Sequence, residues 1–517
     1  MSGEIGTAAR GERHDARERR PGRWLALAVL ALAVLLVAVD ATVLGLATPF
    51  LSEDLRPTGT QLLWIGDVYS FVIAGLLVSM GSLGDRIGRK RLLLCGAVAF
   101  GAVSVLNAYA SSPEMMIAAR ALLGVAGATL MPSTLALIRN IFTDPQERSL
   151  AIGIWGAMAS AGAAVGPVVG GFLLENFWWG SVFLINLPVM AVLVLVGIKL
   201  LPESKDPAPG PWDLPSVLLS MAGIVAVVYA IKEGATHGLS WQVAGVAACG
   251  VLALTGFVRR QLSLDAPLLD MRLFHHRGFS AAVLADLLTV LGLSGMVFFL
   301  SQFLQLVQDR SPLEAGLAEL PAAIGAVTAG LLAGQAARRW SVRSVVAGGL
   351  GAIGLALAAL MWLSAGTDYP VLGAVLLFVG VGAGLSFTVT ADVILSSVPK
   401  EQAGSAAAVS ETAYELGAAL GIAVLGSIVT GIYRDFTVPA GIPPASAAEA
   451  RESLGGAVES AGALPADLGD ALLGSARDAF VEGLRIASGV GALVLLATAV
   501  AAWFLLRGQR LEEGYGG

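Results

Sequence analysis

Long apolar stretches separated by short polar segments run along almost the whole chain. Fourteen of these stretches approach the length of about 20 apolar residues that a membrane-spanning helix needs. They cover roughly 24–48, 62–82, 92–110, 114–138, 149–174, 181–201, 214–232, 241–258, 279–307, 316–336, 343–364, 370–395, 404–431 and 482–506. The sequence therefore predicts an all-α membrane protein with fourteen transmembrane helices, and an even number places both chain ends on one side.

Lysine and arginine are concentrated in alternate polar segments. If the first segment is inside, 24 of the 32 Lys and Arg residues lie in the two terminal segments and the connections on that side. The opposite connections hold six, namely Arg56, Lys232, Arg310, Arg434, Arg451 and Arg477, and two more, Arg120 and Arg485, lie in or beside helices. Positive charge stays in the cytoplasm, so both termini are predicted to be cytoplasmic.

Composition agrees with a membrane protein, since only 14% of the residues are charged whereas a soluble domain carries about 25%. Residues 1–23 read as a disordered cytoplasmic arm without a cleavable signal peptide, and 507–517 as a cytoplasmic tail. There is no phosphate-binding glycine loop, Cys/His metal cluster or serine-hydrolase motif. We therefore expect neither an enzyme nor an ATP-driven pump, and no cofactor, metal or nucleic-acid partner.

The fourteen helices divide into two six-helix bundles and an inserted pair. We expect an N-terminal bundle over 24–201, two inserted helices and a cytoplasmic connector over 202–278, and a C-terminal bundle over 279–506. The last bundle includes a long external segment, 432–481, that forms either a helical hairpin or a flexible loop, with partial order favoured. A degenerate repeat supports the duplication: Gly334–Arg343 follows the tenth helix as 81–90 follows the second, with Arg338 in place of Asp85 and Ser341 in place of Gly88.

The segment 81–93 is the most distinctive connection, a turn with one acid among four cations. Its glycines allow two helix ends to approach closely and turn sharply. It reads either as an ordinary positively charged cytoplasmic loop or as a gate held by a specific ion pair. The candidate gating residues are Gly81, Asp85, Arg86, Gly88 and Arg89.

Ionisable residues inside the apolar stretches are functional candidates, because burying a charge in a membrane is costly. Asp40, Asp67 and Arg120 all fall in the outer halves of their helices. An Asp–Arg–Asp cluster is therefore expected there, for proton coupling or for cation binding. The alternative is a buried ion pair that only holds helices together.

Glu411 and Glu415 are four residues apart, so they share one face of the thirteenth helix. Two neighbouring carboxylates in apolar surroundings can hold protons near neutral pH and release them when a cation arrives. The alternative is a pair of water-facing carboxylates near a helix end. Asp286 is a further intramembrane candidate, whereas Asp392 is expected at the membrane interface.

The fifth helix carries small residues at four-residue spacing around a proline: Gly162, Gly166, Pro167, Gly170 and Gly171. Such spacing allows close helix contact, and the proline permits a bend. On packing grounds alone this is a tight helix interface.

Several of these motifs together resemble the major facilitator superfamily, and most closely its 14-helix drug:proton antiporter branch. The resemblance is carried by Gly-x-Leu-x-Asp-Arg-x-Gly-Arg-Lys in 81–90, by Gly-x-x-x-Gly-Pro-x-x-Gly-Gly in 162–171, by 183–188 and by 410–417. It covers about 22–506. It implies two six-helix bundles and two extra helices around a central cavity that opens alternately to each side, in the inner membrane of a bacterium. It also implies roles for Asp40, Asp67, Glu411 and Glu415 in proton coupling and cation recognition.

Two positions depart from the quaternary-ammonium exporters of that branch. Ala326 stands where they have an acid linked to divalent drugs, and Ser410-Glu411 stands where they have paired acids. Conversely, Asp286 has no acidic counterpart there. Divalent cations are therefore less expected as substrates than monovalent ones.

The resulting hypothesis is a monomeric, proton-coupled multidrug antiporter that exports lipophilic cationic drugs, dyes and antiseptics such as quaternary ammonium compounds and ethidium, in contact with membrane lipid. The alternative is proton-coupled export of an endogenous metabolite, antibiotic or lipid. A different class, a non-transporting membrane receptor or scaffold, is disfavoured by the motifs in 81–91 and 162–171.

Overall fold

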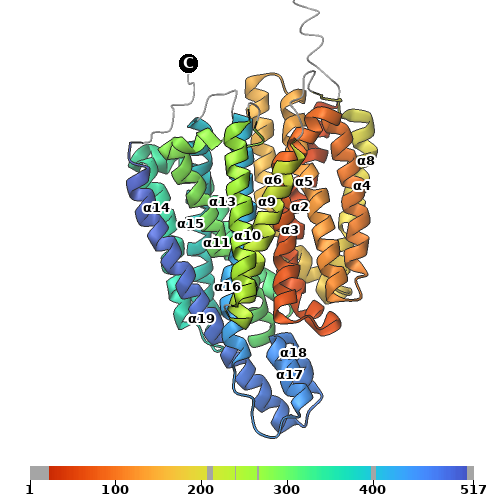
Figure 1. Cartoon of the computed structure of the whole chain (residues 1–517), viewed down its shortest axis with the longest axis vertical. Coiled ribbons are helices and arrows are strands. Elements are labelled where there is room, and N and C mark those ends of the chain that lie inside the picture. The colour runs from red at the N-terminus through yellow and green to blue at the C-terminus, as the bar shows by residue number, and fades with distance from the viewer. Residues whose placement is uncertain are drawn as a thin grey trace, which may run out of the picture.

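The computed structural model describes residues 22–205, 213–238, 240–264, 267–269, 271–397 and 403–508, and these segments are almost entirely helical. Long helices run side by side in one bundle, and α17, α18 and the start of α19 project beyond it (Figure 1). We call this projecting end, at the bottom of the view, the hairpin end. The opposite end, where α3 meets α4 at Gly88, is called the basic end.

The predicted all-α architecture is confirmed. Thirteen described helical stretches are long and apolar enough to span a membrane, and α6, with 32 residues, is a further long helix. The spanning elements are α2 (Arg23–Leu55), α3 (Gly59–Ile87), α4 (Arg89–Ala108), α5 (Pro113–Ile141), α6 (Pro145–Asn176), α7–α8 (Ser181–Leu184, Asn186–Leu200), α9 (Leu214–His237), α10 (Trp241–Ser263), α11 with η2 (Arg277–Gln302, Phe303–Val307), α12–α13 (Pro312–Ala318, Leu320–Trp340), α14 with η3 (Val342–Ala359, Leu360–Trp362), α15 (Tyr369–Ser396), α16 (Ala403–Arg434) and α19 (Ala466–Leu505). The remaining elements are η1 (Met271–His275), α17 (Pro444–Glu452) and α18 (Leu454–Gly462).

Polar residues at the starts of several helices satisfy backbone groups that the helix leaves unpaired. Thr58 and Gln61 form a reciprocal capping box at α3, and Ser311 and Glu314 form another at α12. These caps fix the helix starts at the hairpin end of the bundle.

The glycine-rich motif of α6 joins two neighbouring helices. A Cβ at Gly162 would clash with the Leu35 carbonyl oxygen of α2, and one at Gly170 would lie 2.6 Å from a Val43 methyl group. On another side, a Cβ at Gly171 would lie 2.5 Å from the Pro312 carbonyl oxygen of α12. The absence of side chains therefore lets α6 pack closely on both α2 and α12.

Buried apolar side chains show where the first and last thirds of the chain meet. Residues of α2 from Val39 onward share one apolar cluster with α11, α15, α16 and α19. Most buried apolar residues of α2 before Val39 belong to a separate cluster formed by α2–α8 and adjoining residues. The two sets of helices are thus packed together toward the hairpin end, and α2 contacts a different set toward the basic end.

Two expectations about connections are revised. The charged turn after α3 is a single residue, Gly88, because α3 continues through Asp85 and Arg86 to Ile87. The segment 432–481 contains the short helices α17 and α18, and the last spanning helix begins at Ala466 rather than near 482. Of the two alternatives for this segment, the structure therefore has the helical hairpin.

Some of the predicted features lie outside the residues that the structure describes. They are the arm before residue 22, the tail after 508 and the side chain of Asp85.

Candidate functional site

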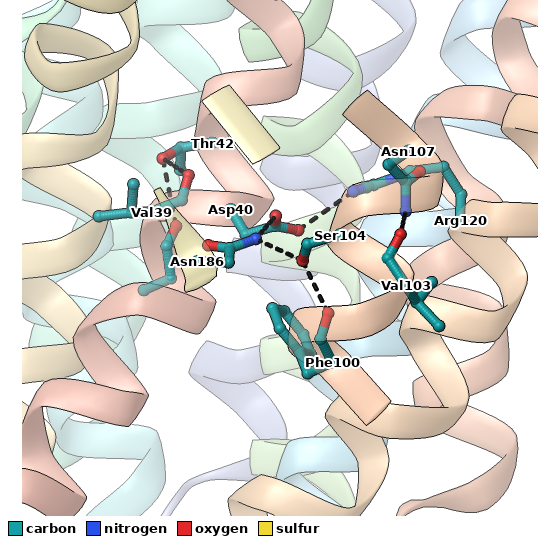
Figure 2. Close-up of polar contacts among 10 residues, drawn as sticks. Val39, Asp40, Thr42, Phe100, Val103, Ser104, Asn107, Arg120 and Asn186 are labelled. Carbon is teal, nitrogen blue, oxygen red and sulfur yellow. Dashed lines mark hydrogen bonds and ion pairs between the residues drawn. The ribbon is translucent and has the colours of Figure 1, made fainter. Parts of the chain in front are cut away.

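The first buried ion pair joins α2 to α5 (Figure 2). Arg120 donates from Nη1 to Asp40 Oδ2 at 3.1 Å, and both side chains are 1% exposed. Close packing of α2 on α6 through Gly162, Gly166 and Gly170 fixes the helix that carries Asp40. The predicted proximity of Asp40 and Arg120 is therefore present in the structure.

Asn186 holds the other oxygen of the same carboxylate. Its Nδ2 donates to Asp40 Oδ1 at 2.9 Å and lies 3.1 Å from Ser104 Oγ. Asn186 is the first residue of α8, immediately after the break between α7 and α8. The break therefore brings a side-chain amide to Asp40, an arrangement that the sequence pattern did not reveal.

Tyr69 of α3 covers the arginine of this site. The Arg120 guanidinium carbon lies 4.7 Å from the centre of the Tyr69 ring, within the range of a cation–π interaction. The Asp40 carboxylate thus has partners on α5 and α8, and those partners contact Tyr69 of α3 and Ser104 of α4 in turn. A proton or another cation reaching Asp40 must compete with Arg120 for it.

The second buried ion pair corrects two sequence-based expectations. Lys232, expected in an external loop, lies inside α9 with its side chain 1% exposed. Its Nζ is 2.9 Å from Asp67 Oδ1 and 2.8 Å from Oδ2. Asp67 is therefore paired with Lys232 and does not share Arg120 with Asp40.

Helix geometry explains why the predicted three-residue cluster divides. Asp67 and Tyr69 are two residues apart on α3, about 200° around the helix, so they point in opposite directions. Because Tyr69 lies on Arg120, Asp67 faces away from it and toward α9.

Asp213 and Arg260 hold the basic ends of α9 and α10 together. Asp213 caps the first turn of α9 and accepts hydrogen bonds from Arg260 at 2.8 to 3.1 Å. The hydrogen bonds from the Arg260 guanidinium hold the pKa of Asp213 below its ordinary value. Helices α9 and α10 are thereby tied to each other as a pair.

Asp286 forms a third buried carboxylate site, with hydroxyl partners. Thr390 of α15 and Ser410 of α16 both donate to it, the latter at 3.3 Å. Asp286 is 4% exposed, and no ion pair to it occurs among the described residues. Its carboxyl group thus joins three helices, α11, α15 and α16.

Glu411 and Glu415 differ from the buried carboxylates because both are partly exposed. They lie one turn apart on α16, and the Ser70 hydroxyl of α3 is a hydrogen-bond partner of Glu415. Neither glutamate has an ion-pair partner in the described part of the chain. Tyr414 lies beside them with 45% of its surface exposed, and its ring centre is 5.9 Å from that of Phe387.

The gating candidates gather around Gly88. The segment that follows α8 packs against this turn: Arg89 donates its backbone N–H to Ser204 at 2.9 Å, and Lys90 donates its own to Glu203 at 3.2 Å. Glu203 thus places negative charge at the start of α4, where the helix dipole favours it. A Cβ at Gly81 would make only ordinary contact with Pro132 of α5.

Glu319 is an intramembrane acid that the sequence reading missed. It lies between α12 and α13, and the Ser301 hydroxyl of α11 is a hydrogen-bond partner. The signal was available, since Glu319 falls within the apolar stretch 316–336. Lys232 and Asn186, by contrast, are recognised through the partners that the fold gives them.

Comparisons with known proteins agree with this architecture. The chain is 49% identical over 493 residues to the multidrug efflux pump LfrA of Mycolicibacterium smegmatis, covering 95% of this chain and 97% of that protein. It is 37% identical to the methyl viologen resistance protein SmvA of Salmonella typhimurium, covering 94% and 99%. A solved structure of a bacterial homologue of the human lysosomal transporter Spinster, inward-facing and unoccupied, matches with a TM-score of 0.61 at 17% identity, covering 95% and 98%.

A family model settles the membership. It matches residues 30–422, which include both buried ion pairs as well as Asp286 and the two glutamates of α16. Because this match spans most of the chain, the chain belongs to the Major Facilitator Superfamily.

Proposed function

We propose that this protein is a proton-coupled multidrug efflux antiporter that exports lipophilic cationic drugs, dyes and antiseptics across a bacterial cytoplasmic membrane. Similarity to LfrA and SmvA over nearly the whole chain supports drug efflux. The positive-inside distribution supports cytoplasmic termini, which makes the basic end cytoplasmic and the hairpin end external.

One observation supports a cationic substrate. Glu411 and Glu415 are partly exposed carboxylates without an ion-pair partner in the described chain, and an exposed tyrosine lies beside them. Carboxylate charge together with an aromatic face suits a lipophilic cation. Asp40 and Asp67, by contrast, are each occupied by a cation of the protein itself.

Proton coupling follows from competition at these acids. A carboxylate that binds either a proton or a cation, but never both, exchanges one for the other. We assign this exchange to Glu411 and Glu415, with Asp40, Asp67 and Asp286 as further proton acceptors. Arg120 returns to Asp40 when that carboxylate gives up its proton.

The conformational cycle rests on the division into two bundles. We propose 24–201 and 279–506 as the moving bundles, with the inserted pair in 202–278 between them, acting as a monomer. The apolar cluster shared toward the hairpin end supports a state closed on that side. Gly170 and Gly171 of the α6 motif pack on Val43 of α2 and on α12 at this closed region, and the turn around Gly88, with Asp85, Arg86 and Arg89, is assigned to the gate at the basic end.

Ethidium efflux from loaded cells tests the proposal. Wild type is compared with Glu411→Gln and Asp40→Asn at matched expression, with and without a protonophore. We expect wild type to export ethidium, the protonophore to abolish export, and both substitutions to cripple it. Export that survives the protonophore contradicts proton coupling. No ethidium export at verified expression contradicts the cationic substrate and favours an endogenous one.

A further inference from the structure

Lys232 is a charged side chain built into apolar surroundings. It is the first charged residue of α9, and the preceding eighteen residues carry no charge. Its ammonium lies 2.9 Å from Asp67 Oδ1 and 4.0 Å from the centre of the Trp64 ring. Phe71 is a second ring at 6.0 Å.

These neighbours are the groups that recognise a lipophilic cation. A carboxylate supplies charge, and an aromatic face attracts a cation within about 6 Å of its centre. The site formed by Asp67, Trp64 and Phe71 therefore has the chemistry of an ammonium-binding site, and the ammonium that occupies it belongs to the protein. We call these three residues the α3 cation site.

The α3 cation site lies where the two bundles meet. One residue from Asp67, a Cβ at Gly66 would lie 3.2 Å from Phe298 of α11 and 3.4 Å from Ile422 of α16. Val228, one turn before Lys232, packs in a cluster with Phe71 of α3 and with Ala419 and Ala423 of α16. Helix α9 thus lies across the α3–α16 junction and places the buried ammonium of Lys232 there.

We propose that the Lys232 ammonium occupies the α3 cation site in place of the cationic substrate. A lipophilic monovalent cation then binds this site only by displacing Lys232. This inference rests on the proposed function, and it gives the inserted helices a role in transport. One carboxylate neutralises one cation, so Lys232 and a bound cation exclude each other. The displacement makes substrate binding weaker than the site alone would allow.

Equilibrium binding of tetraphenylphosphonium to the purified full-length protein tests this proposal. Lys232→Met leaves Asp67 free for the ligand, so we expect binding about tenfold tighter or more than in wild type. Asp67→Asn removes the attracting carboxylate and keeps the repelling ammonium, so binding weakens. The double variant Lys232→Met/Asp67→Asn removes that repulsion, so it binds more tightly than Asp67→Asn alone.

Lys232→Arg is the matched control. Arginine stays charged and keeps a cation on α9, so we expect no tightening of tetraphenylphosphonium binding relative to wild type. Lys232→Met leaves a buried carboxylate unpaired and is the variant most prone to misfold. If it does, the comparison of Asp67→Asn with the double variant decides the question, because the double variant carries no buried charge at this site.

The outcomes separate this inference from the proposed function. Suppose that wild type binds tetraphenylphosphonium and exports ethidium. If Lys232→Met then has the same affinity as wild type, and the double variant the same affinity as Asp67→Asn, Lys232 does not compete with the ligand and the inference is wrong. If neither wild type nor any variant binds the ligand, and ethidium is not exported, the proposed function fails together with it. Tighter binding in both Lys232→Met comparisons supports the inference.

Discussion

Gly88 and Ser341 adopt nearly the same unusual backbone conformation half a chain apart. Gly88 has φ 107° and ψ 129°, and Ser341 has φ 118° and ψ 152°. Each residue forms the single-residue turn between two long helices, α3 and α4 in one case and α13 and α14 in the other. The conformation suits glycine, which has no Cβ, so the second copy holds a serine in a strained position.

Replacing Ser341 with glycine should therefore stabilise the protein. The strain of a side chain at this φ costs on the order of 1 to 3 kcal/mol, whereas exchanging a serine N-cap for glycine costs only a few tenths. We expect Ser341→Gly to raise the thermal unfolding temperature in detergent. Ser341→Ala is the matched control: it keeps the strain and loses the bond from Ser344 N–H, so it should lower that temperature. A lower temperature for Ser341→Gly would contradict the strain argument.

Close α2–α6 packing predicts strong sensitivity at Gly162. Gly162→Val forces a side chain against the Leu35 backbone carbonyl, which cannot move independently of α2. We expect destabilisation of about 1 to 3 kcal/mol or more and loss of folded yield. Gly348→Ala on α14 is the control, because nothing lies within 4 Å of its added Cβ. It should leave the yield unchanged or improve it, since alanine favours helix.

The glycine spacing of α6 is visible in the sequence, and so is the repeat of the 81–90 pattern after the tenth predicted helix, because both are local patterns. It could not assign their partners, since contact of α6 with both α2 and α12 depends on packing between distant segments. Lys232 shows the same limit. The apolar stretch 214–232 ends at it, which suggested an external loop, but α9 continues to His237 and buries the lysine.

The ion pair of Asp40 and Arg120 allows structural and coupling roles to be separated. Arg120→Met leaves the buried carboxylate of Asp40 without its cation, so we expect a loss of about 3 to 5 kcal/mol. The double variant Arg120→Met/Asp40→Asn buries no charge and should regain most of that stability. If Asp40 couples protons, the double variant nevertheless fails to export ethidium. A stable double variant with normal export would show that the pair is only structural.

The sequence identifies the paired acids Asp40 and Asp67 as candidates, but it predicts the partner of only one of them correctly. Asp40 and Arg120 are expected together, and the structure joins them. Asp67 was expected with them because its depth agreed. Depth along a helix says nothing about direction around it, and Asp67 points to α9.

The Asp213–Arg260 contact predicts a pH-dependent contribution to stability. The pKa of Asp213 is lowered in the folded protein, so its contribution is complete above its ordinary value of about 3.9 and is lost as pH falls through the lowered value. Asp213→Asn should therefore lower the unfolding temperature at pH 7, and the difference should shrink at about pH 3 and below.

Asp368→Asn is the matched control for that measurement. Asp368 also stands at a helix start, that of α15, but makes no side-chain capping bond. It should leave the unfolding temperature nearly unchanged at both pH values. An equal effect of both substitutions would mean that the Arg260 contact adds nothing.

Tyr414 should contribute aromatic contact to substrates held by Glu411 and Glu415. Tyr414→Ala removes a ring that is 45% exposed beside both carboxylates, so ethidium efflux should fall several-fold, at about 1 kcal/mol for a cation–π contact. Tyr229→Ala on α9 is the control, because that ring is exposed to a similar extent, 41%, on a different helix. Efflux is measured at matched expression, with Glu411→Gln/Glu415→Gln as the carboxylate-free reference. Equal loss in the two tyrosine variants would remove Tyr414 from the site, whereas loss confined to Tyr414→Ala places cation recognition on this face of α16.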